Sequence, residues 1–189
     1  PKLETAEDLR TVDDALAARW RAGVCVAGIE SIRGVLGLRE AARGSACLRA
    51  LYFGAEDYAT EMGITRSAGG EEVLYARQRV VLGARAAGLA AIDQAVTAIR
   101  DDALFRADAQ KGRAFGYAGK ICLTPGQAAL ANGVFLPSAE ELAHARALLQ
   151  AVREQQREGR GVIAFRGQMV DAPLVARAER LLALAEAAA

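Results

Sequence analysis

Short apolar runs alternate along the chain with longer segments in which apolar residues recur every three or four positions. Four of these runs lack the alternation of polar and apolar residues, which is typical of strands buried on both faces: 24–29, 49–53, 89–92 and 119–123. Helical spacing predicts helices over residues 5–22, 33–43, 71–87 and 101–115. The strand–helix rhythm predicts an α/β fold in which helices cover a parallel sheet.

The rhythm stops near residue 136. Ser138 is a good N-cap for a polar helix that runs to about 157, and residues 162–170 are typical of a hairpin that turns near Gly167. A last helix is predicted from Ala172 through Leu184, with Pro173 in its first turn. We therefore expect two parts, residues 1–136 with the sheet and residues 137–189 as an appendage.

Composition excludes several function classes. The net charge of +1 gives no indication of a nucleic-acid partner, and no apolar stretch approaches the roughly 20 residues of a membrane span. The cysteines Cys25, Cys47 and Cys122 form no C-x-x-C pair, so we expect reduced thiols in a cytoplasmic protein. One histidine, His144, is too few for a histidine metal site, and we expect it at the surface.

Acidic residues follow two of the predicted strands. Glu30 follows the run 24–29, and Glu56 and Asp57 follow the run 49–53. In α/β barrels the carboxyl ends of the strands form the rim at which chemistry takes place. Two carboxylates suit Mg²⁺, whose other positions are filled by water and substrate oxygens, so Glu30 and Asp57 are candidate metal ligands. The alternative is that each acid only caps the helix after it.

Gly54 and Ala55 form a turn of small residues before a helix expected to begin near Tyr58. Backbone N–H groups in such a turn bind a carboxylate, which makes Gly54, Ala55 and Glu56 candidate substrate-binding residues. Alternatively, Gly54 serves the geometry of the turn, and Glu56 faces either the ion through water or the solvent. Asp93 is a third acid at a strand end, and we expect it to be a structural cap.

Six segments in order resemble the citrate lyase beta subunit family of Mg²⁺-dependent aldolases and lyases. They are Pro1-Lys2-x-Glu4, Gly28-Ile29-Glu30-Ser31-x-Arg33-Gly34-Val35, Phe53-Gly54-Ala55-Glu56-Asp57-Tyr58, Ala91-Ile92-Asp93, Gly116-Tyr117-x-Gly119-Lys120-Ile121-Cys122 and Val170-Asp171-Ala172-Pro173. The resemblance implies a (β/α)₈ TIM barrel, which has eight strands. We identify only four full strands, so the chain is expected to be the C-terminal part of such a barrel, without its N-terminal strands.

The resemblance also implies an activity and an assembly. Its members are carbon–carbon lyases that cleave or form citryl-CoA, malyl-CoA or citramalyl-CoA, with Mg²⁺ as cofactor and an acyl-CoA and a 2-oxo acid as substrates. It implies a homo-oligomer, a trimer, in which residues 137–189 close as a lid over a neighbouring subunit's site. There Asp171 handles the proton; the alternative, which does not exclude this role, is that Asp171 caps the last helix.

One residue departs from the family pattern, and one family residue cannot be assigned in this sequence. Thr124 stands where the family commonly has a histidine, and the family's substrate-binding arginine belongs to the first half of the barrel. Lys120 is either structural or a contact for a CoA phosphate. Three functions therefore stay open: a CoA-dependent lyase, a CoA-independent pyruvate aldolase of the same barrel class, and a degenerate subunit without catalysis.

Overall fold

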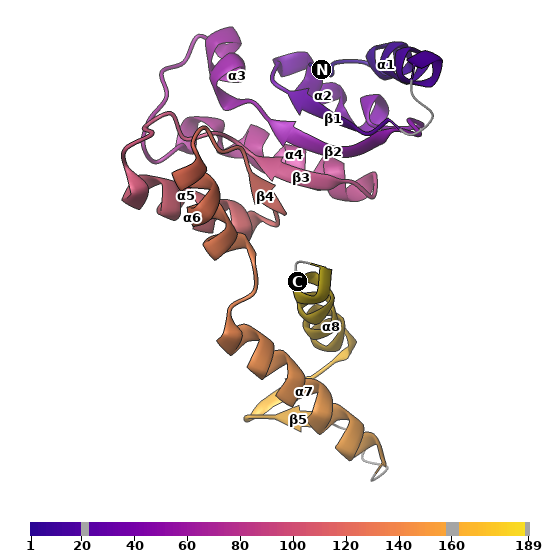
Figure 1. Cartoon of the computed structure of the whole chain (residues 1–189), viewed down its shortest axis with the longest axis vertical. Helices are drawn as coiled ribbons and strands as arrows, with labels where there is room; N and C mark the ends of the chain where they lie inside the picture. Colours follow the sequence, from indigo (N-terminus) through magenta and orange to yellow (C-terminus); the bar gives the residue numbers. More distant parts are fainter. Residues whose placement is uncertain (20–22, 158–162, 188–189) are drawn as a thin grey trace. The chain divides into compact units, whose positions relative to one another are not determined.

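The computed structural model describes residues 1–19, 23–157 and 163–187. The chain forms two compact units, Pro1–Phe135 and Leu136–Ala189 (Figure 1). Among the described residues, no helix combines the length and the apolar character needed to cross a membrane.

The first unit contains a parallel sheet of four strands in the order β1-β2-β3-β4. The strands are β1 (Cys25–Ile29), β2 (Leu48–Phe53), β3 (Ala90–Asp93) and β4 (Gly119–Lys120). The chain start extends the sheet beyond β1, because Lys2 forms a parallel bridge with Gly28. The predicted parallel α/β arrangement is confirmed for this unit.

The described part of the first unit also contains six α-helices. They are α1 (Ala6–Arg19), α2 (Ile32–Ala41), α3 (Ala55–Met62), α4 (Leu74–Ala86), α5 (Asp102–Phe115) and α6 (Pro125–Phe135), and a 3₁₀ turn η1 (Glu71–Val73) precedes α4. Trp20, in the helix predicted over 5–22, lies outside the described residues.

Two predictions about these elements were wrong. Helix α3 begins at Ala55 rather than near Tyr58, because Gly54 already occupies its N-cap position. The strand predicted over 119–123 ends at Lys120, and α6 follows it from Pro125. Proline is well placed at the start of a helix, where its missing N–H costs nothing.

The two faces of the sheet differ in burial. Ala27, Leu51 and Ala91 are register neighbours, are fully buried, and belong to the main core together with residues of α2 and α4. Since side chains alternate along a strand, Val26 and Gly28 lie on the opposite face, where Val26 is 45% exposed. This less covered face is the one that leads to Glu30.

The second unit combines two helices and a hairpin: α7 (Ala139–Arg157), β5 (Ile163–Phe165), β6 (Gln168–Val170) and α8 (Ala172–Ala187). The predicted hairpin is confirmed, and it turns at Arg166 and Gly167, whose φ angles are 51° and 79°. Two positive φ angles in a two-residue loop match the twist of paired antiparallel strands. His144 is exposed, as expected, with its ring 5.3 Å from that of Phe165.

Candidate metal and substrate site

Strands β1 and β2 end level with each other, which brings two candidate residues together. Ile29 pairs with Phe53, and the Gly54 N–H donates to the Ile29 carbonyl at 3.0 Å. Glu30 and Gly54 therefore leave the sheet side by side. Glu30 does not cap the next helix, because the N-cap of α2 is Ser31, whose hydroxyl accepts from the Gly34 N–H at 3.0 Å.

One lysine joins the two predicted metal ligands. The Lys2 Nζ lies 3.1 Å from Asp57 Oδ2 and 3.8 Å from Glu30 Oε2. The hydrogen bond to Asp57 raises the pKa of Lys2, so its ammonium group stays charged. The sequence did not identify Lys2 as a site residue. The Pro1-Lys2-x-Glu4 segment was a sequence signal for this region, but it gave no position for Lys2. The parallel bridge between Lys2 and Gly28, seen in the structure, places Lys2 beside Glu30.

Two glycines make room for the Glu30 side chain. A Cβ atom on Gly54 would lie 2.4 Å from Glu30 Cγ, and one on Gly28 would lie 2.8 Å from Glu30 Oε1. Gly54 has φ −95° and ψ 83°, so space beside Glu30, rather than a left-handed backbone, explains the glycine. The alternative role of Gly54, that turn geometry requires it, is therefore replaced by a steric one.

Tyr52 is the residue of β2 that pairs with Gly28, and it lies next to the same carboxylate. A Cβ atom on Gly28 would also meet the Tyr52 hydroxyl, at 2.5 Å. Burial, together with the hydrogen bond to Glu30 and its negative charge, raises the pKa of Tyr52 to about 12. Tyr52 therefore stays a neutral donor beside Glu30 over the physiological pH range.

The first turn of α3 borders the carboxylate pair. The first backbone bond of the helix runs from the Tyr58 N–H to the Gly54 carbonyl at 3.2 Å, so the N–H groups of Ala55, Glu56 and Asp57 have no partner within the helix. Such groups, with the positive end of the helix dipole, favour an anion. The Glu56 carboxylate itself pairs with Arg66 Nε at 3.1 Å.

The acid at the end of β3 has a different role from the first two. Asp93 is fully buried and accepts from Arg77 Nε at 2.8 Å and from Arg77 Nη2 at 2.5 Å. Arg77, itself fully buried, also donates to Asp108, and Lys120 lies between Asp93 and Asp108. The prediction that Asp93 caps a helix was wrong, because Asp101 caps the next helix, α5.

These four side chains form a closed set of two cations and two anions in the interior. Burial would raise the pKa of Asp108, but the charges of Lys120 and Arg77 outweigh it and the pKa falls below its ordinary value. The Lys120 Nζ also donates to the Gln94 carbonyl at 2.6 Å, so Lys120 is a structural residue here.

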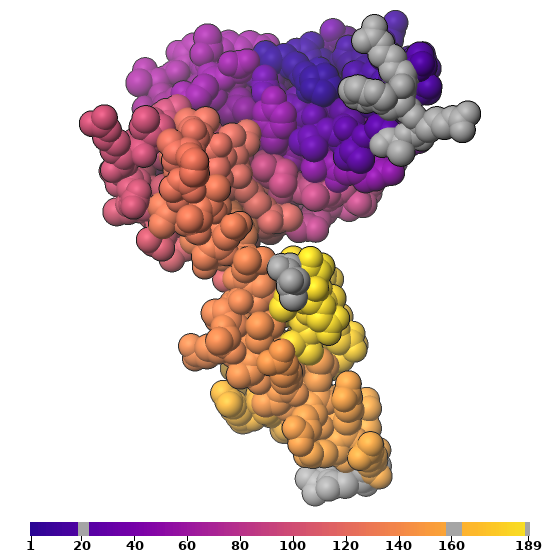
Figure 2. Space-filling view, in the orientation of Figure 1, coloured from indigo at the N-terminus to yellow at the C-terminus, as the bar shows by residue number. Residues whose placement is uncertain are grey.

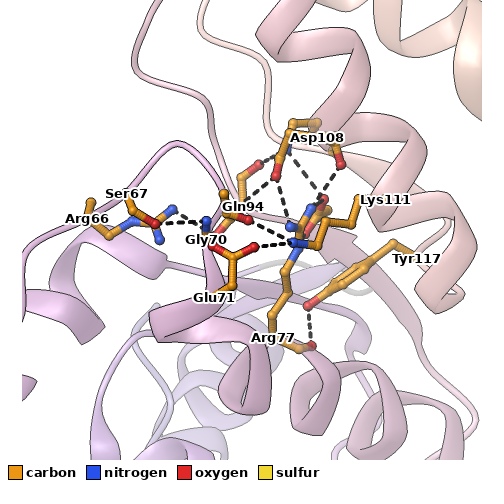
Figure 3. A network of polar contacts seen from close by, with 12 residues as sticks. Arg66, Ser67, Gly70, Glu71, Arg77, Gln94, Asp108, Lys111 and Tyr117 are labelled. Carbon is orange, nitrogen blue, oxygen red and sulfur yellow. Dashed lines mark hydrogen bonds and ion pairs between the residues drawn. The ribbon is translucent and has the colours of Figure 1, made fainter.

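A chain of contacts runs from this buried set to Arg66 (Figure 3). Gln94 donates to Asp108 at 3.2 Å and accepts from Arg66 at 3.2 Å, and Arg66 in turn holds Glu56. Glu56, Arg66, Gln94 and Asp108 all line a cavity of about 280 Å³ beside the first turn of α3. Glu56 therefore forms part of the cavity wall, where its carboxylate pairs with Arg66.

Asp171 lies in the second unit, at the start of α8. Its Oδ1 accepts from the Leu174 N–H at 3.1 Å, and its side chain is exposed. Asp171 is thus an N-cap, as one of its two expected roles requires. Thr124 has a similar local role in the first unit, where its hydroxyl accepts from the Gln127 N–H at 3.1 Å at the start of α6.

Glu30 and Asp57 fit a hard divalent cation. Two carboxylates that converge on one ammonium group already form a cation site, and carboxylate oxygens are the ligands Mg²⁺ prefers. Within the described ranges, no three histidine, cysteine, aspartate or glutamate residues cluster as a possible metal site. A metal here would thus take two protein ligands, and water or substrate would supply the rest.

Residues 1–125 match the model of a protein family described as HpcH/HpaI aldolase/citrate lyase. The chain belongs to this family. A relative within it, a citrate lyase subunit beta-like protein of Deinococcus radiodurans, is 47% identical over 182 residues, which are 96% of this chain and 64% of that protein. Citrate lyase subunit beta of Leuconostoc mesenteroides is 37% identical over 194 residues, 99% of this chain and 64% of that protein.

A solved structure of the family is also similar to this fold. Protein CitE from Mycobacterium tuberculosis, in complex with magnesium, acetoacetate and coenzyme A, superposes with a TM-score of 0.79 at 29% identity, over 97% of this chain and 66% of that chain. The chain therefore spans a little under two thirds of the length of the relatives it matches.

Proposed function

We propose that the protein is a Mg²⁺-dependent carbon–carbon lyase that splits a 3-hydroxyacyl-CoA into an acyl-CoA and a 2-oxo acid, or joins the two. The observation that carries this proposal is the Glu30–Asp57 pair around one cation, at the carboxyl ends of neighbouring parallel strands. The family adds support, since its members include citrate lyase beta subunits and citramalyl-CoA lyase.

In this proposal each part of the site has one task. Glu30 and Asp57 hold the ion, which supplies a Lewis acid for the keto oxygen when bound. The free N–H groups of Ala55 and Glu56, after the N-cap Gly54, bind the carboxylate of the oxo acid. Gly54 and Gly28 leave space for Glu30, and Tyr52 donates a hydrogen bond to it.

Cleavage breaks the bond between the acyl α-carbon and the carbon that bears the hydroxyl group. The hydroxyl loses its proton, and the α-carbon gains one. We assign the proton transfer at the α-carbon to Asp171, brought by the second unit of a neighbouring subunit in a homotrimer. Its exposure leaves the carboxylate free to meet another surface, and an N-cap keeps one oxygen oriented while the other is available.

The first unit is proposed to be part of a (β/α)₈ barrel, with the second unit as a lid over the site of a neighbouring subunit. The partial exposure of Val26 on the sheet face that leads to Glu30 supports this, because that face would line the interior of a closed barrel.

A substrate panel tests the proposal. The full-length protein, with and without Mg²⁺, is given citryl-CoA, malyl-CoA, citramalyl-CoA, or pyruvate with an aldehyde, and products are measured by mass spectrometry. We expect Mg²⁺-dependent release of an acyl-CoA and a 2-oxo acid from one of the CoA esters, lost in Glu30→Gln and Asp57→Asn. Products only from pyruvate and the aldehyde would favour a CoA-independent aldolase, and no products at all would favour a subunit without catalysis.

A further inference from the structure

Lys2 is held in place by the backbone around it. The Gly28 N–H donates to the Pro1 carbonyl at 2.7 Å, and the Leu3 N–H donates to the Gly28 carbonyl at 2.8 Å. These two bonds fix the backbone of Lys2 beside β1, while its side chain remains 46% exposed. Figure 2 shows indigo atoms of the N-terminal part of the chain at the surface of the first unit. Hydrogen bonds thus fix the Lys2 backbone, while its side chain, which carries the ammonium group, remains accessible to solvent.

The position of the ammonium group conflicts with a bound metal. A divalent ion held by Glu30 and Asp57 would bind carboxylate oxygens that contact the Lys2 ammonium group in this structure. The Lys2 Nζ lies 3.1 Å from Asp57 Oδ2. A bound metal would therefore displace the ammonium group from these oxygens, and the group would stay nearby because the Lys2 backbone is held by hydrogen bonds.

We propose that Lys2 is a resident counter-cation that makes the Glu30–Asp57 site bind a divalent metal together with an anionic oxo acid rather than the metal alone. This inference rests on the proposed function of the site.

Charge counting gives the reason. With Lys2 the carboxylate pair carries one formal negative charge, so a divalent ion leaves one positive charge and a monocarboxylate then neutralises the site. Without Lys2 the metal alone neutralises the pair, and the incoming carboxylate adds an unbalanced charge. Glu56 is left out of this count because its carboxylate contacts Arg66, which Glu72 also contacts, while Lys2 pairs with Glu30 and Asp57. With Lys2, the site is neutral when both the metal and the oxo acid are bound. Without Lys2, it is neutral when the metal alone is bound.

Titration calorimetry on the full-length protein tests this, with MgCl₂ as probe in the absence and presence of saturating pyruvate. In the wild type, pyruvate should tighten Mg²⁺ binding. In Lys2→Met, Mg²⁺ alone should bind about threefold to tenfold more tightly, the range expected for removing one cation near a solvent-exposed site. The tightening caused by pyruvate should shrink by a similar factor. Lys2→Arg should behave as the wild type.

Arg33→Met is the matched control, because it removes the same charge from an exposed residue in the first turn of α2. It should leave both affinities unchanged. If Lys2→Met binds Mg²⁺ as the wild type does or more weakly, while Glu30→Gln binds it much more weakly than the wild type, Lys2 has no such role and the metal site stands. If Glu30→Gln binds Mg²⁺ as well as the wild type, the metal site and this inference both fail.

Discussion

Replacement of Gly54 by alanine should change the position of the Glu30 side chain without removing either carboxylate of the site. The added Cβ would lie 2.4 Å from Glu30 Cγ and 2.8 Å from both Cδ and Oε1, far inside van der Waals contact. The backbone at Gly54, with φ −95° and ψ 83°, is not left-handed, so alanine brings no conformational strain of that kind. The clash falls on Glu30, whose side chain must move from its present position.

The size of the effect follows from the cost of overpacking. An extra methyl group in a filled space costs about 1–3 kcal/mol. If the displacement of Glu30 absorbs this cost, the affinity for Mg²⁺ falls about 5- to 150-fold, since each 1.4 kcal/mol is a factor of ten. The fold should survive, because Glu30 is at the end of a strand and keeps 15% of its side chain exposed.

Calorimetry with MgCl₂ measures this change, and thermal unfolding checks the fold. Gly133→Ala in α6 is the control, because nothing lies within 4 Å of its added Cβ. A double variant supplies the refutation: once Glu30 is glutamine, adding Gly54→Ala should cost no further affinity. Wild-type affinity in Gly54→Ala, or a full additional loss in the double variant, would show that Gly54 does not act through Glu30.

Three further predictions concern the proton carrier, the buried charges and the pH dependence of stability. Asp171→Asn keeps the N-cap and Mg²⁺ binding but should lower turnover by about 10²–10⁴-fold. Mixed oligomers of Asp171→Asn and Asp57→Asn subunits should recover part of the activity. If they assemble but recover none, the site is not shared between subunits. Arg77→Met leaves Asp93 buried with less compensation and should lower the free energy of unfolding by about 3–5 kcal/mol in urea titrations, whereas the exposed Arg100→Met should have little effect. For Glu72, burial raises the pKa, but hydrogen bonds within the 67–72 loop and Arg66 outweigh it and lower the pKa to about 2 from 4.5. Because the folded pKa is the lower one, Glu72 stabilises the fold above pH 4.5 and loses this contribution as the pH falls toward 2, so the stability difference between wild type and Glu72→Gln should shrink over that interval.

The sequence predicts the sheet well because its signal is local. Unbroken apolar runs such as 24–29 indicate strands that need no knowledge of their partners, and β1, β2 and β3 lie where those runs are. The N-caps Ser138 and Asp171 are equally local, since each bonds to an N–H three residues later. Helix α6 could not be predicted in this way, because its alanine-rich segment has little amphipathic periodicity to reveal it.

The roles of Lys2 and Arg77 could not be predicted for a different reason. Their partners are distant in sequence: Lys2 meets Asp57, and Arg77 of α4 meets Asp93 and Asp108. Neither pairing follows from spacing along the chain, because both depend on which strands lie side by side. The resemblance to a family marked the neighbourhood of Lys2 but gave no role to it.

The three acids at strand ends look alike in sequence, and the cations around them separate their roles. Asp93 is enclosed by Arg77 and Lys120, with no exposed side-chain surface on any of the three, so no ligand can reach its oxygens. Glu30 and Asp57 share one lysine that is 46% exposed, and Asp57 itself is 60% exposed. A buried acid with buried partners stabilises the fold, whereas an accessible pair with one exposed partner can exchange that partner for another cation. The number and exposure of the neighbouring cations, rather than the position of an acid at a strand end, therefore identify Glu30 and Asp57 as the candidate site.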